Sequence, residues 1–499
     1  MTFLRFRSAP GHTGTLTRVL ARRHPRRSAH LHTHRSPTAP PVLTTALAVA
    51  TALAVTVSTV TPATAGDAGD ATVPGVPPSL TASDPTIALP ADDPFYTPPD
   101  RIPATPGSLI RSQFAPQLLD AFDTGDAPGR ADRILYTSTT QDGVKVATSG
   151  VVLQPSGKWN GPGPTPTVVF APGTRGAGDH CAPSRSGALL AGVGTDNGTL
   201  NLNINYEYPF HALASALGYR VVVVDLIGLG TPGQHTYVNH TEEGHAVLDG
   251  ARAGLEFAGA PADSPVAFFG YSQGGGAAAG AAELAASYAP ELNVRGTFAG
   301  APPGRLDTVA GAVDGNLIAG VLGYALNGVW ARHPELVSLK DEYFNEEGHR
   351  YVSSTADECI ITSVLNWGLR DSRTLTRDGR SFPEIIREDP RLRDVLSDTN
   401  LRLGSRRPAS PVLIVNGRND DTIPWSQARD TAADYCSLGA TVQFTTEETA
   451  SVLPRSAINH AVPLLTQAGT AFRYINDRFN NVPAPSNCGE LTESAGSVD

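Results

Sequence analysis

Residues 266–276, Val266-Ala267-Phe268-Phe269-Gly270-Tyr271-Ser272-Gln273-Gly274-Gly275-Gly276, join a short apolar run to a long alanine-rich segment. The run before Gly270 predicts a buried strand, and residues 273–288 predict a helix. Glycine at positions 270 and 274 leaves room for a tight turn that holds Ser272 in a strained backbone conformation with its hydroxyl exposed. The small residues that follow allow the helix to pack closely under the turn. The stretch therefore predicts a nucleophile on a strand–turn–helix elbow; the alternative is a glycine-rich turn around an ordinary serine.

Strand and helix patterns alternate on both sides of this elbow. The spacing predicts strands over residues 168–171, 219–224, 297–299, 412–415 and 441–445, and helices over residues 209–217 and 241–257. Residues 134–153 contain two β-rich runs joined by Gln141-Asp142-Gly143, which predicts a hairpin. The pattern favours an α/β fold with a mostly parallel sheet, helices on both faces and right-handed crossovers.

The segment between residues 303 and 405 breaks this alternation. Roughly a hundred residues separate two predicted strands there, far more than a normal crossover needs. Its first part, residues 306–330, is apolar and is predicted to be helical. We interpret residues 303–405 as an inserted, mainly helical cap over the C-terminal ends of the strands, and additional core packing is the alternative. The two parts of the α/β core are then residues 93–302 and 406–499.

The first 65 residues hold eight arginines and no acidic residue. Four of these arginines lie between residues 22 and 27, a charge-free run follows at residues 43–60, and Ala63-Thr64-Ala65 offers small residues for cleavage. This pattern predicts a cleaved signal peptide over residues 1–65; the alternative is a membrane anchor, since about 18 apolar residues just span a bilayer. Residues 66–92 are rich in Pro, Ala and Asp and predict a flexible lead-in.

Composition and charge exclude several classes of protein. The chain has 499 residues, of which 40% are hydrophobic and 17% charged, too apolar a composition for a disordered chain. The formal net charge is -10 although the N-terminus is basic, so the remainder is strongly acidic and repels nucleic acid. The four cysteines, Cys181, Cys359, Cys436 and Cys488, form no C-x-x-C pair, which argues against zinc. An even number of cysteines in an exported protein suggests two disulfides.

A serine nucleophile needs a base, and the base needs an acid that orients it. After such an elbow the three residues occur along the chain in the order Ser, Asp, His. The loop after the predicted strand at 412–415 contains Asp420 and Asp421. Asp420 is our candidate for the acid, Asp421 is the competitor, and a solvated acidic loop is the alternative to both. His460 is the one histidine that follows Asp420, so it is the candidate base, placed just before a closing helix that runs to about Phe479.

A tetrahedral intermediate also needs two hydrogen-bond donors for its oxyanion. One is expected from the backbone N–H of Gln273, the residue after the nucleophile. The other is expected from the glycine-rich loop after the strand at 168–171, with Thr174 as the candidate and Asp179 as its support. A phosphate-binding loop is excluded because no G-K-[S/T] follows these glycines.

With these residues identified, the chain resembles the secretory lipase family of α/β-hydrolases over about residues 95–488. The segments that carry the resemblance are Phe95-Tyr96-Thr97-Pro98-Pro99, Ala171-Pro172-Gly173-Thr174-Arg175-Gly176, Cys181-Ala182-Pro183-Ser184, Asp225 with Gly228-Leu229-Gly230, Gly270-Tyr271-Ser272-Gln273-Gly274-Gly275 and Gly300-Ala301-Pro302-Pro303. The chain departs from the family at Leu226-Ile227, where relatives often have an aromatic residue and an acid. That departure affects the expected pocket shape and leaves the triad untouched.

The resemblance implies an α/β-hydrolase fold with an inserted helical cap, or lid, between the sixth and seventh sheet strands. It implies a triacylglycerol or acyl-ester hydrolase with Ser272, Asp420 and His460 as its triad. It also implies the disulfide pairs Cys181–Cys359 and Cys436–Cys488; the residues alone leave three connectivities open.

The leading hypothesis is a secreted serine lipase that cleaves carboxylic esters, with no cofactor, no metal and no stable protein partner. Its substrate would be a lipid or another acyl ester, with transient contact with a lipid interface, and the apolar cap favours medium or long acyl chains. A carboxylesterase or an acyltransferase would use the same triad. A peptidase would need a reader of the substrate terminus, and none is evident. A non-catalytic surface or binding module is the alternative from another class.

Overall fold

The computed structural model describes residues 93–117, 129–186, 189–196 and 198–495. The predicted signal peptide at 1–65 and the predicted lead-in at 66–92 lie outside these residues and stay predictions.

A mixed sheet forms the centre of the described chain. The strands follow one another across the sheet in the order β1 (Leu109–Phe114), β2 (Ala131–Thr139), β3 (Lys145–Leu153), β7 (Arg220–Val224), β4 (Thr167–Ala171), β8 (Pro265–Tyr271), β9 (Asn293–Gly300), β10 (Val412–Gly417) and β11 (Val442–Glu447). Pairing is antiparallel from β1 to β7 and parallel from β7 to β11. The predicted hairpin is β2–β3, and the expected α/β-hydrolase fold with a mostly parallel sheet is confirmed.

Helices cover both faces of this sheet. They are α2 (Tyr208–Ala216), α3 (His240–Phe257), α4 (Gln273–Tyr288), α12 (Trp425–Ser437), α13 (Ile458–Thr466), α14 (Ala468–Phe479) and α15 (Cys488–Ala495). Successive strand residues point to opposite faces, so Phe170 packs with α2 and α14 while Val169 packs with α3 and α4. The alanines of α4 allow the close packing that the sequence predicts.

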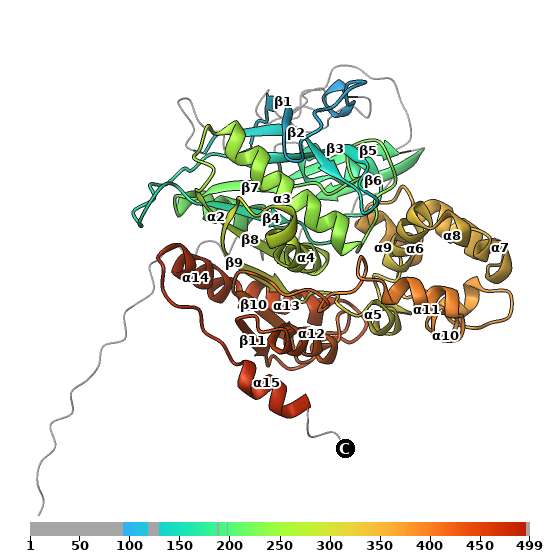
Figure 1. The fold of residues 1–499 in the computed structure, drawn as a ribbon. Coiled ribbons are helices and arrows are strands. Elements are labelled where there is room, and N and C mark those ends of the chain that lie inside the picture. The colour runs from blue at the N-terminus through green and yellow to red at the C-terminus, as the bar shows by residue number, and fades with distance from the viewer. Residues whose placement is uncertain (1–92, 118–128, 187–188, 197, 496–499) are drawn as a thin grey trace, which may run out of the picture. The chain divides into compact units, whose positions relative to one another are not determined.

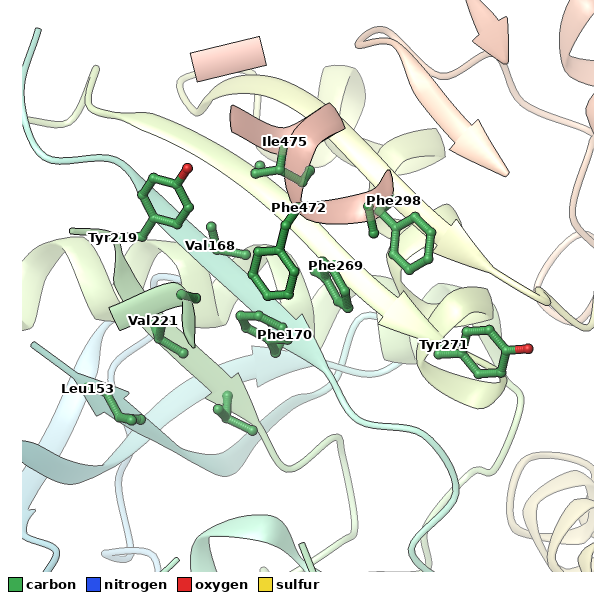
Figure 2. Close-up of a cluster of buried hydrophobic side chains, with 14 of the residues drawn as sticks. Leu153, Val168, Phe170, Tyr219, Val221, Phe269, Tyr271, Phe298, Phe472 and Ile475 are labelled. Carbon is green, nitrogen blue, oxygen red and sulfur yellow. The ribbon is translucent and has the colours of Figure 1, made fainter. Parts of the chain in front are cut away.

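The face covered by α14 holds a cluster of aromatic side chains (Figure 2). Phe269 lies 4.7 Å from Phe298 and 5.3 Å from Phe472 of α14, measured between ring centroids. Burying each such side chain contributes about 1.5–3 kcal/mol. Through Phe269, this cluster packs β8, the strand that carries the elbow, against α14.

Between β9 and β10 the described chain is helical, and its helices gather in one group beside the sheet (Figure 1). They are α5 (Leu306–Val313), α6 (Val321–Arg332), α7 (Leu339–Tyr343), α8 (Glu346–Thr355), α9 (Ile360–Trp367), α10 (Phe382–Glu388) and α11 (Pro390–Ser397). Residues 306–330 are largely helical, as the sequence predicts, and they form two helices because the chain turns between α5 and α6. Gly315 has φ +71 there, and the Asp314 carboxylate accepts hydrogen bonds from the backbone N–H and the hydroxyl of Ser372.

Two features of the strand arrangement have no counterpart in the sequence-based prediction. Strand β1 extends the antiparallel edge of the sheet, and β5 (Ala191–Asp196) pairs with β6 (Thr199–Ile204) in a separate hairpin. Both cysteine pairs form disulfides, Cys181–Cys359 and Cys436–Cys488, in the pairing that the resemblance implies.

Candidate active site

Ser272 lies in the turn between β8 and α4, as the elbow prediction requires. Its backbone has φ 61 and ψ -125, a conformation that residues other than glycine rarely adopt. A Cβ at Gly270 would overlap the carbonyl oxygen of Gly274, and a Cβ at Gly274 would overlap that of Ala171. Only glycine therefore fits at the two positions that flank the strained serine.

The side chains of Ser272, His460 and Asp420 are joined by hydrogen bonds. The distance from His460 Nε2 to Ser272 Oγ is 2.8 Å, and that from His460 Nδ1 to Asp420 Oδ2 is also 2.8 Å. The imidazole is 10% exposed and the Asp420 carboxylate is fully buried. These three residues lie 188 and 40 positions apart along the chain, and the fold brings them together.

Asp420 is held in place by its own loop. Its Oδ1 accepts hydrogen bonds from the backbone N–H groups of Thr422 at 2.9 Å and Ile423 at 2.8 Å. The other carboxylate oxygen is left to face the imidazole. An ionised carboxylate in this position accepts the proton on Nδ1, so Nε2 is the atom that accepts from the serine hydroxyl.

Asp421, the competing acid, contacts backbone and not the imidazole. Its Oδ2 accepts hydrogen bonds from the N–H groups of Ser456 at 3.1 Å and Ala457 at 3.2 Å. Ala457 has φ 60 and is the N-cap of α13, the helix that carries His460. Placing His460 before a single closing helix was wrong, because it lies in the first turn of α13, and α14 is a separate helix that begins at Ala468.

Tyr271, within the elbow itself, contacts His460, and the sequence analysis did not predict this contact. Its hydroxyl donates to the backbone carbonyl of His460 at 2.7 Å, and the two rings lie 5.3 Å apart. Burial, with the neighbouring charge of Asp420, raises the pKa of Tyr271 well above its usual range, so the phenol keeps its proton. Nothing in the motif distinguishes this tyrosine from an ordinary core residue.

The two expected oxyanion donors lie on the same cavity as Ser272. Gln273 and Thr174 both line it, and Gln273 is the first residue of α4, where the helix dipole is positive. The Thr174 hydroxyl lies 2.7 Å from the hydroxyl of Tyr237. Asp179 does not support Thr174 directly: its carboxylate accepts from the N–H of Gly230 at 3.0 Å.

A buried ion pair fixes the loop that carries Thr174. Arg175 Nη2 lies 2.9 Å from Glu207 Oε2, and both side chains are almost fully buried. The same carboxylate accepts from the backbone N–H of Gly173 at 3.1 Å. Burial raises the pKa of Glu207 above its usual value, and the nearby guanidinium of Arg175 offsets only part of this rise. Residues on both sides of Thr174 are thus fixed to one carboxylate.

The same loop is also tied to the helices between β9 and β10. Ala177 N–H donates to Glu358 O at 3.0 Å, Ile360 N–H donates to Arg175 O at 2.8 Å, and the Cys181–Cys359 disulfide lies beside these bonds. A Cβ at Gly176, where φ is +140, would lie 2.5 Å from Cys359 Cα. The close approach of these two segments therefore requires glycine at 176.

An apolar cavity of about 980 Å³, including the open space at its mouth, leads away from Ser272. Its polar lining residues are Thr174, Tyr237, Ser272, Gln273 and Thr422, all from the sheet side of the molecule. The remaining lining residues are apolar, and most come from α5, α6, α10 and α11. A hydroxyl nucleophile therefore lines a cavity whose other lining residues are mostly apolar.

Two features are absent from the part of the chain that the structure describes. There, no helix combines the length and apolar character that crossing a membrane requires. Within the same residues, no group of three or more His, Cys, Asp or Glu side chains is placed to hold a metal ion.

A serine on an elbow between strand and helix, hydrogen-bonded through a histidine to a buried aspartate, defines the class of ester hydrolases with the α/β-hydrolase fold. Residues 196–487 match the secretory lipase family. The chain belongs to the secretory lipase family.

Two curated relatives illustrate the range of this family. The chain is 28% identical to Secreted triacylglycerol lipase LIP4 of Malassezia globosa over 81% of this chain and 84% of the relative. It is 30% identical to a probable inactive lipase of Mycobacterium tuberculosis over 79% of this chain and 83% of the relative.

Solved structures give the same fold. Candida antarctica lipase A matches with a TM-score of 0.65 and 25% identity, covering 81% of this chain and 89% of that one. The rice cell wall degrading esterase LipA from Xanthomonas oryzae matches with a TM-score of 0.59 and 20% identity, covering 75% of this chain and 99% of that one. The second likeness concerns the fold alone.

Proposed function

We propose that this protein is an exported triacylglycerol lipase that works through an acyl-enzyme on Ser272. The observation that carries the proposal is the hydrogen-bonded series Ser272–His460–Asp420, in which Ser272 lines an apolar cavity. The Malassezia globosa relative, named as a triacylglycerol lipase, supports the choice of substrate.

In the first half of the reaction, Ser272 Oγ attacks the ester carbonyl carbon while its proton passes to His460 Nε2. The carbonyl π electrons move onto the oxygen and form a tetrahedral oxyanion. Asp420 stabilises the imidazolium and keeps its Nδ1–H pointing away from the serine. When the tetrahedral species collapses, the proton on Nε2 passes to the leaving alkoxide, and the alcohol departs.

In the second half, water takes the place of the alcohol. His460 removes a proton from the water, the hydroxide oxygen attacks the acyl-enzyme carbonyl, and collapse expels Ser272 Oγ, which recovers its proton from the imidazolium. The backbone N–H of Gln273 and the Thr174 hydroxyl donate to the oxyanion in both halves. Preformed donors of this kind need no reorganisation as the charge develops.

The cavity gives the substrate class. Apolar side chains line the cavity beside Ser272, and each CH₂ of an acyl chain that they remove from water favours binding by about 0.8 kcal/mol. We assign residues 303–405 to a cap that supplies this apolar lining through α5, α6, α10 and α11. Longer chains gain more from this lining than acetate does.

Two observations support the proposal that this protein is exported. Both disulfides favour an oxidising compartment, and relatives in the family are named as secreted. On this proposal residues 1–65 are removed as a signal peptide and the mature chain begins at Gly66.

The test is ester hydrolysis by residues 66–499 on p-nitrophenyl esters from acetate to palmitate and on an emulsified triacylglycerol. We expect kcat/KM to rise with chain length and released fatty acid to match consumed triacylglycerol. Ser272→Ala should reduce the rate by at least about 10³-fold. A sharp preference for acetate with no release from triacylglycerol would contradict the substrate class, and full activity of Ser272→Ala would contradict the mechanism.

A further inference from the structure

Tyr237 lies between the elbow and the helical group and contacts the candidate donor Thr174. Its hydroxyl is 2.7 Å from Thr174 Oγ1, and both residues line the cavity beside Ser272. The tyrosine is 8% exposed, and its ring packs edge-on against Tyr324 at 5.6 Å between centroids. The phenol is therefore held in place against the hydroxyl on which the proposed mechanism depends.

The direction of this hydrogen bond decides what Thr174 can do. A threonine hydroxyl has a single proton to donate and two lone pairs with which to accept. Burial raises the pKa of Tyr237 well beyond the physiological range, so the phenol keeps its proton and is able to donate. If Tyr237 donates to Thr174 Oγ1, the threonine proton is free for an acceptor on the other side, which is the oxyanion.

The segment around Tyr237 is itself fixed to the other oxyanion donor. The backbone N–H of Val238, a residue with φ 57, donates to Glu243 Oε1 at 3.0 Å. The same oxygen accepts from the side-chain amide of Gln273 at 2.8 Å. One buried carboxylate therefore sets the position of Tyr237 relative to Gln273, whose backbone N–H is the first donor.

The Gln273 amide is held from a second side by His235. His235 Nδ1 lies 2.9 Å from the carbonyl of Ile227, so this nitrogen carries the proton. Nε2 then accepts from Gln273 Nε2 at 2.8 Å. Burial lowers the pKa of His235, in keeping with a neutral ring. The two halves of the oxyanion site are thus joined through the backbone of Tyr237 and Val238 and the hydrogen bonds to Glu243.

We propose that Tyr237 is a positioning residue that donates its hydroxyl proton to Thr174 Oγ1 and so directs the Thr174 proton at the oxyanion. The inference rests on the proposed function, in which Thr174 is the second donor. Hydrogen bonds in series polarise one another, so the Thr174–oxyanion bond is strengthened by the phenol behind it. Without that phenol, the threonine hydroxyl can rotate away from the oxyanion.

The test is a double-mutant cycle on the mature protein with p-nitrophenyl butyrate. Removing an oxyanion donor costs about 10²–10³ in kcat, so we expect Thr174→Val to lie near the lower figure. Tyr237→Phe should lower kcat by about tenfold with KM within about twofold, because the substrate ground state does not need the aligned proton. Tyr237→Phe added to Thr174→Val should have no further effect on kcat.

Controls separate positioning from packing. Tyr324→Phe removes a hydroxyl from the adjacent buried ring and should leave kcat within about twofold of wild type. Thr174→Ser retains the hydroxyl, and its kcat should still fall about tenfold when Tyr237→Phe is added. The affinity of an alkyl boronic acid, which forms a tetrahedral adduct on the serine, should fall in parallel with kcat in each variant.

Several outcomes would overturn the inference. Equal kcat for wild type and Tyr237→Phe, or independent and multiplicative losses in the double variant, would show that Tyr237 does not act through Thr174. An equal loss in Tyr324→Phe would assign the effect to packing. A wild-type protein that hydrolyses no ester would overturn the proposed function as well, whereas an active wild type with an unaffected Tyr237→Phe would overturn this inference alone.

Discussion

The Asp421 carboxylate lies 3.2 Å from the backbone N–H of Ala457, the residue that starts the helix carrying His460. Its neighbour Asp420 contacts the His460 ring. Two adjacent aspartates therefore act on the same histidine in different ways, one through the imidazole and one through the backbone that presents it.

Replacement of each aspartate should separate these roles. Asp420→Asn should lower kcat by about 10⁴-fold with little change in stability, because an amide favours the wrong imidazole tautomer. Asp421→Ala should lower kcat no more than about tenfold but lower the free energy of unfolding by about 1–3 kcal/mol, since two partly buried N–H groups lose their acceptor. Steady-state rates measure the change in kcat, and urea unfolding measures the change in stability. A large loss of kcat in Asp421→Ala with a small one in Asp420→Asn would contradict these roles.

The two disulfides should differ in their effect on rate. Cys181–Cys359 closes 178 residues and lies beside the Thr174 loop, while Cys436–Cys488 closes 52 and joins α12 to α15. The chain-entropy estimate gives upper limits of about 5 and about 4 kcal/mol for their stabilisation. Replacing the first pair with serine should also lower kcat by about tenfold, and replacing the second should not. Equal kcat values in the two double variants would show that the first disulfide does not support the oxyanion loop.

Two helical glycines offer a matched test of the packing under the elbow. A Cβ at Gly275 would overlap the carbonyl oxygen of Gly300, whereas a Cβ at Gly311 would have no atom within 4 Å. Gly275→Ala should therefore destabilise the protein by at least about 3 kcal/mol. Gly311→Ala should stabilise it by about 0.5–1 kcal/mol, because alanine favours a helix more than glycine does. Thermal unfolding of both variants measures these changes in stability. A Gly275→Ala variant as stable as wild type would contradict the close contact between residues 275 and 300.

Stability should fall as the pH drops, partly through His211. Burial, with the nearby charge of Arg175, lowers the pKa of His211 from 6.5 to about 3. Between these values the unfolded chain binds a proton that the folded chain does not, so unfolding is favoured progressively as the pH falls from 6.5 towards 3. Each pH unit in this window costs about 1.4 kcal/mol from this one side chain.

Urea unfolding at pH 7 and pH 5 measures this effect. His211→Leu should reduce the loss of unfolding free energy between these pH values by about 2 kcal/mol relative to wild type. Equal losses in wild type and His211→Leu would show that His211 titrates normally in the folded chain.

The elements that the sequence predicted best are those defined by strong local patterns. The strand of β7 is almost wholly valine, and α4 is defined by its alanines, so both could be located within one or two residues. The chain order of Ser272, Asp420 and His460 reduced the choice of base to one histidine. The hydrogen bonds that join these three side chains support the triad, and their catalytic roles stay a proposal.

Other features depend on contacts between distant segments, which no local pattern contains. The turn at Gly315 needs Ser372 of a later segment, and β1 forms because β2 offers it an edge. Tyr237 looks like any loop aromatic until the fold places its hydroxyl against Thr174. The competing roles of Asp420 and Asp421 likewise become distinct only when α13 is placed beside them.

Activation of Ser272 by His460 to form a covalent acyl-enzyme can be measured by mass spectrometry after treatment with an alkyl fluorophosphonate. We expect one adduct per chain, on the peptide containing Ser272, formed by wild type and slowed at least about 10³-fold in His460→Ala. An adduct on another residue, or equal labelling of wild type and His460→Ala at Ser272, would contradict this activation.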